Sequence, residues 1–161
     1  MEREFRIKGL MMDPITNSPI VILQDNDKTT LLPIWVGIFE ANAIALQIER
    51  IDTPRPMTHD LIKNLIGQLG GEVEKVVVTE LKESTFFAVI HLIQDGGPVI
   101  IDSRPSDAIA VALRTDCPIF VTEQVIESSR NITLEKENAD PEEVKKWLEN
   151  LNPEDLGKYK M

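Results

Sequence analysis

The chain has 161 residues, of which 42% are hydrophobic and 27% are charged, and its formal net charge is −10. This length suits one domain that buries roughly two thirds of its unfolded surface, and ordinary Gly and Pro contents exclude a fibrous or low-complexity protein. The longest apolar run, Leu31 to Phe39, contains Pro33 and Gly37 and is shorter than the about 20 residues of a membrane helix.

The charge balance and the single cysteine exclude further classes of protein. With 17 Lys and Arg against 27 Asp and Glu, the chain as a whole repels a polyanion. Contact with nucleic acid must therefore be local, metal-assisted or confined to a small basic cluster such as Arg50, Arg55 and Arg104. Cys117 is alone, which excludes an intramolecular disulfide and a cysteine-rich zinc site. The first four residues carry charges of both signs and no secretory signal, so we expect a cytoplasmic location.

Alternating or β-branched apolar residues predict three strands before residue 37. These strands are Glu4–Lys8, Pro19–Leu23 and Thr30–Val36. The apolar period then becomes helical over Glu40–Arg50. A second helix begins at Thr58 and ends before Gly70 and Gly71, because glycine favours the left-handed conformation at a helix C-terminus.

The middle of the chain returns to strands and then alternates between helix and strand. The predicted elements are the strands Glu72–Lys82, Thr85–Gln94 and Val99–Asp102, the helix Pro105–Arg114, the strand Ile119–Val121 and a helical turn from Glu123 to Ser128. We therefore expect an α+β fold, with mixed and largely antiparallel sheets packed against helices.

Two similar stretches suggest an internal duplication. Pro33-Ile34-Trp35-Val36 precedes an Ala- and Ile-rich helix, and Pro98-Val99-Ile100-Ile101 precedes another. The hypothesis is two related halves, each with three strands followed by two helices. The alternative is that short Ala/Ile helices resemble one another by chance. The two helices must follow equivalent strands if the duplication is real.

The composition changes after residue 130, which divides the chain into a domain over 1–130 and an acidic extension over 131–161. Asp140-Pro141 is typical of a helix start, with an acceptor at the cap and proline at the first position. Val144, Trp147 and Leu151 give this helix one apolar side. We expect an appended amphipathic helix that is loosely docked or partly disordered.

The densest group of polar residues is Asp102-Ser103-Arg104-Pro105-Ser106-Asp107, between a predicted strand and a helix. Asp102 and Asp107 offer the hard oxygen ligands that a divalent metal prefers, and Arg104 can grip a phosphate group. The alternative is structural: Pro105 and Asp107 are ordinary residues for a first helical turn, and Asp102 pairs with Arg104.

Two further acids and a histidine stand at predicted helix starts. His59 is a candidate general base or metal ligand, and Asp60 next to it complements the helix dipole. Glu40 stands at the start of the first helix, where it is a candidate ligand or only a partner of the dipole.

Three segments together resemble the bifunctional nuclease (BFN) domain family. They are Leu32–Gly37 with Glu40-Ala41, Arg55–Leu61, and Asp102–Ala110, and the resemblance covers about residues 1–130. It implies an α+β domain with nuclease activity on both DNA and RNA. It also implies functional roles for the following residues of this chain: Glu40, His59, Asp60, Asp102, Arg104 and Asp107. Ser103 departs from the family's pattern, in which Ala is expected.

Two functions are compatible with these features. In the first, the protein is a nuclease: Glu40, Asp102 and Asp107 bind Mg²⁺ or Mn²⁺, Arg104 stabilises phosphate charge, and His59 moves a proton. In the second, it is a non-enzymatic homodimeric interaction or regulatory module whose motif residues cap helices. The hairpin from Glu72 to Gln94, with the apolar residues Val76, Val78, Phe86 and Phe87, would then supply the dimer face.

Overall fold

Two three-stranded meanders form the outer parts of one seven-stranded sheet in the computed structural model, which describes residues 1–137. The first meander consists of β1 (Glu2–Met12), β2 (Pro19–Asp25) and β3 (Leu31–Trp35), and the second of β4 (Gly71–Lys82), β5 (Thr85–Gln94) and β6 (Gly97–Ser103). The strand β7 (Ile119–Thr122) lies between them, so the sheet order is β3-β2-β1-β7-β4-β5-β6. Only the pair β4–β7 is parallel, and every other neighbouring pair is antiparallel.

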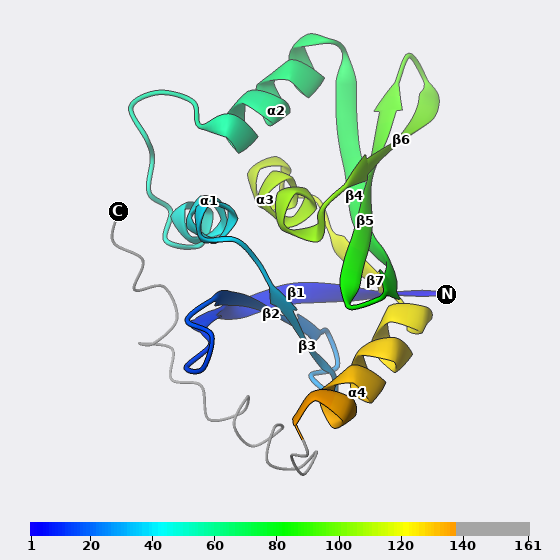
Figure 1. The fold of residues 1–161 in the computed structure, drawn as a ribbon. Coiled ribbons are helices and arrows are strands. Elements are labelled where there is room, and N and C mark those ends of the chain that lie inside the picture. The colour runs from blue at the N-terminus through cyan, green and yellow to red at the C-terminus, as the bar shows by residue number, and fades with distance from the viewer. Residues whose placement is uncertain (138–161) are drawn as a thin grey trace.

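The helices of the described residues are α1 (Ile38–Ile48), α2 (Thr58–Gln68), α3 (Pro105–Thr115) and α4 (Glu123–Glu137). The first three lie together (Figure 1), with α3 in contact with both α1 and α2. The helix α3 also packs on β4 and β5, whereas α4 lies apart from the other helices and contacts β4 and β7. Within residues 1–137, no helix combines the length and the apolar character that a membrane crossing requires.

Tight turns set the register of the second meander. Glu83 and Ser84 join β4 to β5, and Asp95 and Gly96 join β5 to β6; all four residues have positive φ values. Two successive residues with positive φ form the turn type whose twist matches that of the flanking strands. Gln94 therefore pairs directly with Gly97, and the pairing continues to Ala88 and Ser103.

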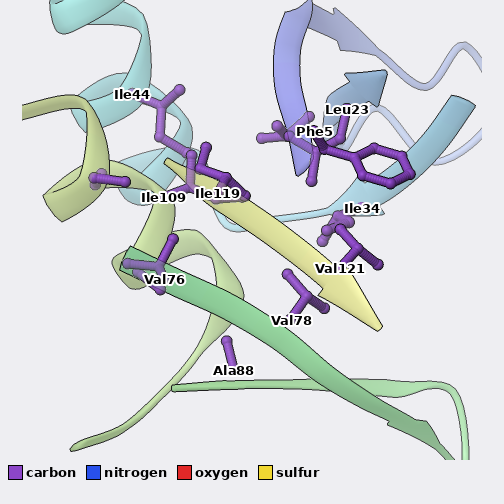
Figure 2. Packing of buried hydrophobic residues seen from close by; sticks show 14 of the residues in the cluster. Phe5, Leu23, Ile34, Ile44, Val76, Val78, Ala88, Ile109, Ile119 and Val121 are labelled. Carbon is purple, nitrogen blue, oxygen red and sulfur yellow. The ribbon is translucent and has the colours of Figure 1, made fainter. Parts of the chain in front are cut away.

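The main hydrophobic core lies between the sheet and the three clustered helices. It brings together side chains from both meanders, from β7 and from the helices α1 and α3 (Figure 2), and Val125 and Ile126 of α4 also belong to it. The labelled members are Phe5, Leu23, Ile34, Ile44, Val76, Val78, Ala88, Ile109, Ile119 and Val121. Because α3 is rich in Ala, its backbone can approach the sheet closely while Ile109 fills the space.

The predicted elements and the α+β fold class are confirmed. The last helix is longer than predicted, since α4 continues from Glu123 across residue 130 to Glu137. The helix predicted after Asp140 lies outside the described residues. The helices α1 and α3 each follow the edge strand of a meander, as the duplication hypothesis requires, but β7 in the second half has no counterpart in the first.

The dimer face expected on the β4–β5 hairpin is wrong for most of its residues. Val76 and Val78 belong to the main core and are 1% exposed, because β4 is an inner strand of the sheet and α3 covers it. Phe86 is partly buried against the same core. Of the residues named for this face, only Phe87 is exposed.

Candidate functional site

The N-terminal ends of α1, α2 and α3 meet, although their sequences lie far apart in the chain. Glu40 is in the first turn of α1, His59 in the first turn of α2, and Asp107 in the first turn of α3. Arg104 is the residue before α3, with extended backbone, and Pro105 then begins the helix with its fixed φ. Each side chain is thus placed by the start of a helix.

A continuous chain of hydrogen-bonded side chains links these residues. Arg104 donates from Nη2 to Oε1 of Glu40 at 2.6 Å and from Nε to Oδ2 of Asp107 at 3.0 Å. The other carboxylate oxygen of Asp107, Oδ1, lies 2.9 Å from Nε2 of His59. We call Glu40, Arg104, Asp107 and His59 the helix-start cluster. It contains residues from each of the three segments that carry the family resemblance.

The hydrogen bonds of the cluster lower the pKa of both carboxyl groups. For Glu40 the main cause is the hydrogen bond that Arg104 donates. Burial raises the pKa of Asp107, but the hydrogen bonds from His59 and Arg104 outweigh that effect and the net shift is downward. The same two carboxylates, Asp107 first, raise the pKa of Arg104. Glu40, Asp107 and Arg104 are therefore all charged at neutral pH.

The contact with Asp107 fixes the tautomer of His59. A carboxylate only accepts hydrogen bonds, so the proton of a neutral imidazole must be on Nε2. This leaves Nδ1 as the basic nitrogen. The side chain of His59 makes its hydrogen bond to Asp107 through Nε2, and Nδ1 has no partner among the described residues. No buried polar side-chain atom of the described residues lacks a partner. Nδ1 is therefore not buried and must reach the surface, although His59 as a whole residue is only 8% exposed.

Asp60 belongs to a second ion pair, whose partner Arg114 was not singled out in the sequence. Nε of Arg114 donates to Oδ1 of Asp60 at 2.7 Å, and its Nη atoms donate to the carbonyl oxygens of Ala110 and Ala43. The Arg114 side chain is 2% exposed. Since Ala43 is in α1, Asp60 in α2 and Ala110 in α3, this one guanidinium ties together the three helices of the cluster.

A sequence signal for Arg114 did exist. It is a full positive charge at the end of a helix whose other residues from Ala108 to Leu113 are all apolar. Burial of such a charge requires a carboxylate partner, and Asp60 is the acid that meets it. Burial raises the pKa of Asp60, but the backbone N–H of Met57 and then Arg114 outweigh this and lower it.

Asp102 is not part of the helix-start cluster. It pairs with Val89 across β5 and β6, whereas the next residue, Ser103, pairs with Ala88 of the main core. Successive residues of a strand point to opposite faces, so Asp102 points away from the helices. The expected pairing of Asp102 with Arg104 is also wrong, because Arg104 bonds to Glu40 and Asp107 instead.

The cluster in this arrangement does not fit Mg²⁺ or Mn²⁺. Asp107 uses both oxygens for His59 and Arg104, and the guanidinium occupies the position between the carboxylates where a cation would bind. Within the part of the chain that the structure describes, no group of three or more His, Cys, Asp or Glu side chains is placed to hold a metal ion. The set Glu40, Asp102 and Asp107 is not brought together.

A cavity of about 330 Å³ lies beside the cluster rather than within it. Its walls come from the end of α1, the following loop and the first turns of α2, and they include Leu46, Ile51 and Arg55. The pair Asp60–Arg114 also lines it. Asp60 follows His59 directly, so the cavity and the cluster share the first turn of α2.

Comparison with known proteins gives the family of this domain. Residues 21–133 match the model of the bifunctional nuclease domain. The chain belongs to this family. The matched range contains the whole helix-start cluster as well as Asp60 and Arg114. The hydroxyl of Ser103, the residue expected to be Ala, donates to the carbonyl oxygen of Arg104.

Relatives of this bifunctional nuclease domain occur in bacteria and plants. An uncharacterized protein of Mycobacterium tuberculosis is 37% identical over 162 residues, which cover 95% of this chain and 97% of the relative. Bifunctional nuclease 1 of Arabidopsis thaliana is 33% identical over 107 residues, which cover 64% of this chain and 33% of the relative. Bifunctional nuclease 1 of Oryza sativa subsp. indica is 26% identical over 118 residues, which cover 71% of this chain and 36% of the relative. The chain thus matches about a third of the length of these plant proteins.

Proposed function

We propose that this domain cleaves phosphodiester bonds of DNA and RNA at the helix-start cluster. One observation carries the proposal: the three separate segments of the family resemblance supply one hydrogen-bonded chain of Glu40, Arg104, Asp107 and His59. A histidine held by a carboxylate next to an arginine is a combination that can move a proton and bind a phosphate group. The plant relatives named bifunctional nuclease 1 agree with this activity.

Each residue has a distinct role in the proposed reaction. Asp107 holds the imidazole so that Nδ1 of His59 accepts the proton of the attacking oxygen, which is water or, in RNA, the ribose 2′-hydroxyl. As the new P–O bond forms, the P–O bond to the leaving oxygen breaks, and that oxygen takes up a proton from solvent. Arg104 donates hydrogen bonds to the phosphate oxygens, whose negative charge increases in the transition state. Glu40 orients Arg104 through the bond to Nη2.

Arg104 is able to bind both its carboxylate partners and a substrate. A guanidinium has five N–H donors, and the bonds to Glu40 and Asp107 use Nη2 and Nε. The Nη1 group therefore remains for a phosphate oxygen. The side chain is 64% exposed, so a nucleic acid strand can reach it without opening the fold. Local contact of this kind is compatible with the net charge of −10.

The test is cleavage of labelled DNA and RNA oligonucleotides by the purified chain and by His59→Gln, Arg104→Lys and Asp107→Asn. Loss of a general base reduces a rate by about 10² to 10⁴-fold, and we expect His59→Gln and Asp107→Asn to fall in that range. A contaminating nuclease would act equally in every preparation. Unchanged cleavage by Asp107→Asn would therefore contradict the proposal.

Asp102→Asn is the matched control. It removes the same charge from the same segment, but Asp102 lies on the other face of β6, so cleavage should be unchanged. Each reaction is run with EDTA and with Mg²⁺ or Mn²⁺. If cleavage needs metal and Asp102→Asn abolishes it, the metal site expected from Glu40, Asp102 and Asp107 is supported over the arrangement proposed here.

A non-enzymatic interaction module is the second candidate. It is favoured by the partners of the two acids. Glu40 is bound to Arg104 and Asp107 to His59, and each of these contacts joins two helix starts, so stability alone can account for these residues. No cleavage of any substrate under any metal condition, with normal stability of the chain, would favour this module over the nuclease.

A further inference from the structure

The edge strand β6 leaves apolar side chains exposed on both of its faces. It ends the sheet next to β5, and no strand of the described residues pairs with its outer side. Ile100 is 61% exposed and Ile101, on the opposite face, is 41% exposed. On the face of Ile100, Phe87 and Ile93 of β5 are also exposed. Proteins normally protect such an edge with charge, proline or a covering segment.

The hairpin turn determines which backbone groups of β6 point outward. Gln94 and Gly97 close a two-residue turn, so they form a hydrogen-bonded pair. Bonded and non-bonded pairs alternate along an antiparallel ladder. Val99 and Ile101 therefore bond to β5, whereas the N–H and C=O groups of Ile100 and Asp102 are directed to the outer side of the sheet.

The opposite edge of the sheet is better protected. The strand β3 has Pro33 at its centre, opposite Ile22 of β2, and proline interrupts the donors of an edge. Leu32 and Ile34 of β3 are buried, and the indole of Trp35, which is 51% exposed, donates from Nε1 to the Asp13 carboxylate. In β6 the proline, Pro98, stands near the start of the strand, and the outward groups of Ile100 and Asp102 remain intact.

We propose that β6 pairs antiparallel with β6 of a second copy, across a two-fold axis at Ile100, and so joins two sheets into one. In this register Ile100 lies opposite the partner's Ile100, and Val99 lies opposite the partner's Ile101. The whole strand takes part, because Gly97 then lies opposite the partner's Ser103. This inference is independent of the proposed nuclease activity.

The register at Ile100 satisfies both hydrogen bonding and side-chain packing. Ile100 exchanges hydrogen bonds with the partner's Ile100, and the N–H of Asp102 donates to the carbonyl oxygen of the partner's Pro98. Directly opposed residues of antiparallel strands point to the same face, so Val99 and the partner's Ile101 pack together. On the other face Ile100 and its copy each lie beside His91 of their own β5, and the exposed residues Phe87 and Ile93 lie farther along β5 on the same face.

Charge is compatible with this register. Two chains with a net charge of −10 repel each other, so their contact must be made by a segment with little charge. Asp102 is the single charged residue of β6. The axis at Ile100 places it opposite the partner's Pro98 and not opposite another carboxylate, so like charges are not directly opposed.

The test uses Ile100→Pro, measured by sedimentation velocity at increasing protein concentration. The N–H of Ile100 makes no bond to β5, so proline removes only the outward donor and should leave the circular dichroism spectrum unchanged. We expect the wild-type chain to be a dimer and Ile100→Pro and Ile100→Lys to be monomers. Ile15→Lys is the control, because Ile15 is an equally apolar residue, 87% exposed, in the β1–β2 connection.

Hydrogen exchange of the wild-type chain provides a second measurement if the proline variant fails to fold. In the dimer the amide of Ile100 should be protected, although it has no acceptor within its own chain. A wild-type monomer at all concentrations would overturn the proposal. A dimer in which the Ile100 amide exchanges freely would also overturn it, because another surface would then form the contact.

Discussion

At the scale of single residues, Asp107 determines the geometry of the helix-start cluster. Each of its carboxylate oxygens has its own donor, His59 on one side and Arg104 on the other. The sequence predicted an acid in the first turn of a helix, because capping is a local property. It did not predict His59 as the partner, because the two residues are 48 positions apart and meet only through the packing of α2 on α3.

The charge of Asp107 should therefore stabilise the fold. In Asp107→Asn the side chain is uncharged and cannot accept charge-assisted hydrogen bonds from both His59 and Arg104. Hydrogen bonds to charged groups contribute about 1.5–3 kcal/mol. Since the side chain is 29% exposed, we expect a loss of about 1–2 kcal/mol and a lower Tm by calorimetry. Asp102→Asn should change the stability by less than about 0.5 kcal/mol. A higher Tm for Asp107→Asn would instead indicate repulsion among the acids.

Gly37 leaves room for the Glu40 carboxylate. A Cβ atom at this position would overlap the Glu40 carboxylate, while the backbone itself is ordinary for any residue, with φ −72°. Gly37→Ala should therefore displace the flexible Glu40 side chain from Arg104 and leave the helix intact. We expect a stability change below about 1 kcal/mol, together with the same loss of cleavage as in Glu40→Gln. A much smaller loss of cleavage than in Glu40→Gln would show that Glu40 keeps its place.

At the scale of secondary structure, helix boundaries depend on neighbouring residues, whereas the burial of a strand depends on contacts between distant segments. The start of α2 at Thr58, its end before Gly70 and the start of α3 at Pro105 follow from neighbouring residues, and the structure confirms them. The face of Asp102 could not be predicted, because Val99, Ile100 and Ile101 are all apolar and only the pairing of β6 with β5 shows which face the helices cover. The burial of Val76 and Val78 could not be predicted either, because it depends on β7 pairing with β4 and on α3 covering β4.

Arg114 holds the three clustered helices at fixed relative positions. Removing one partner of a buried ion pair costs about 3–5 kcal/mol, and Asp60 is 28% exposed, so we expect about 2–4 kcal/mol for Arg114→Met. Arg114→Lys keeps the charge but cannot reach Asp60, Ala43 and Ala110 together, and it should lose nearly as much. Urea unfolding measures both variants. Full stability of Arg114→Lys would show that charge alone matters.

At the scale of the whole molecule, the paired carboxylates determine the response to acid. The pKa values of Asp25, Glu40, Asp60 and Asp107 are all lowered in the folded chain. A lowered pKa contributes stability above the unfolded pKa, and this stability is lost as the pH falls through the folded pKa. Protonation also reduces the negative net charge of the chain and its internal repulsion, which opposes this loss of stability. In the paired carboxylates, however, protonation also breaks hydrogen bonds and ion pairs of the folded chain.

We therefore expect the free energy of unfolding to decrease as the pH falls below about 4, the ordinary range of carboxyl groups. Urea unfolding at a series of pH values measures this decrease. The slope should be smaller in Asp60→Asn and Asp107→Asn, which each lack one of the titrating groups. An identical slope in the wild-type chain and both variants would show that these two carboxylates do not contribute to it.

The position of β7 has a consequence for synthesis of the chain. β7 pairs with Glu2–Phe5 on one side and with Val76–Val78 on the other, and Arg3 also binds Glu123. The ribosome makes these partners long before Ile119 emerges. Until then the inner edges of β1 and β4 are both unpaired, and such edges attract other strands. Completion of the sheet must therefore wait for one of the last strands, and a chain terminated before Ile119 should aggregate even though both meanders are present.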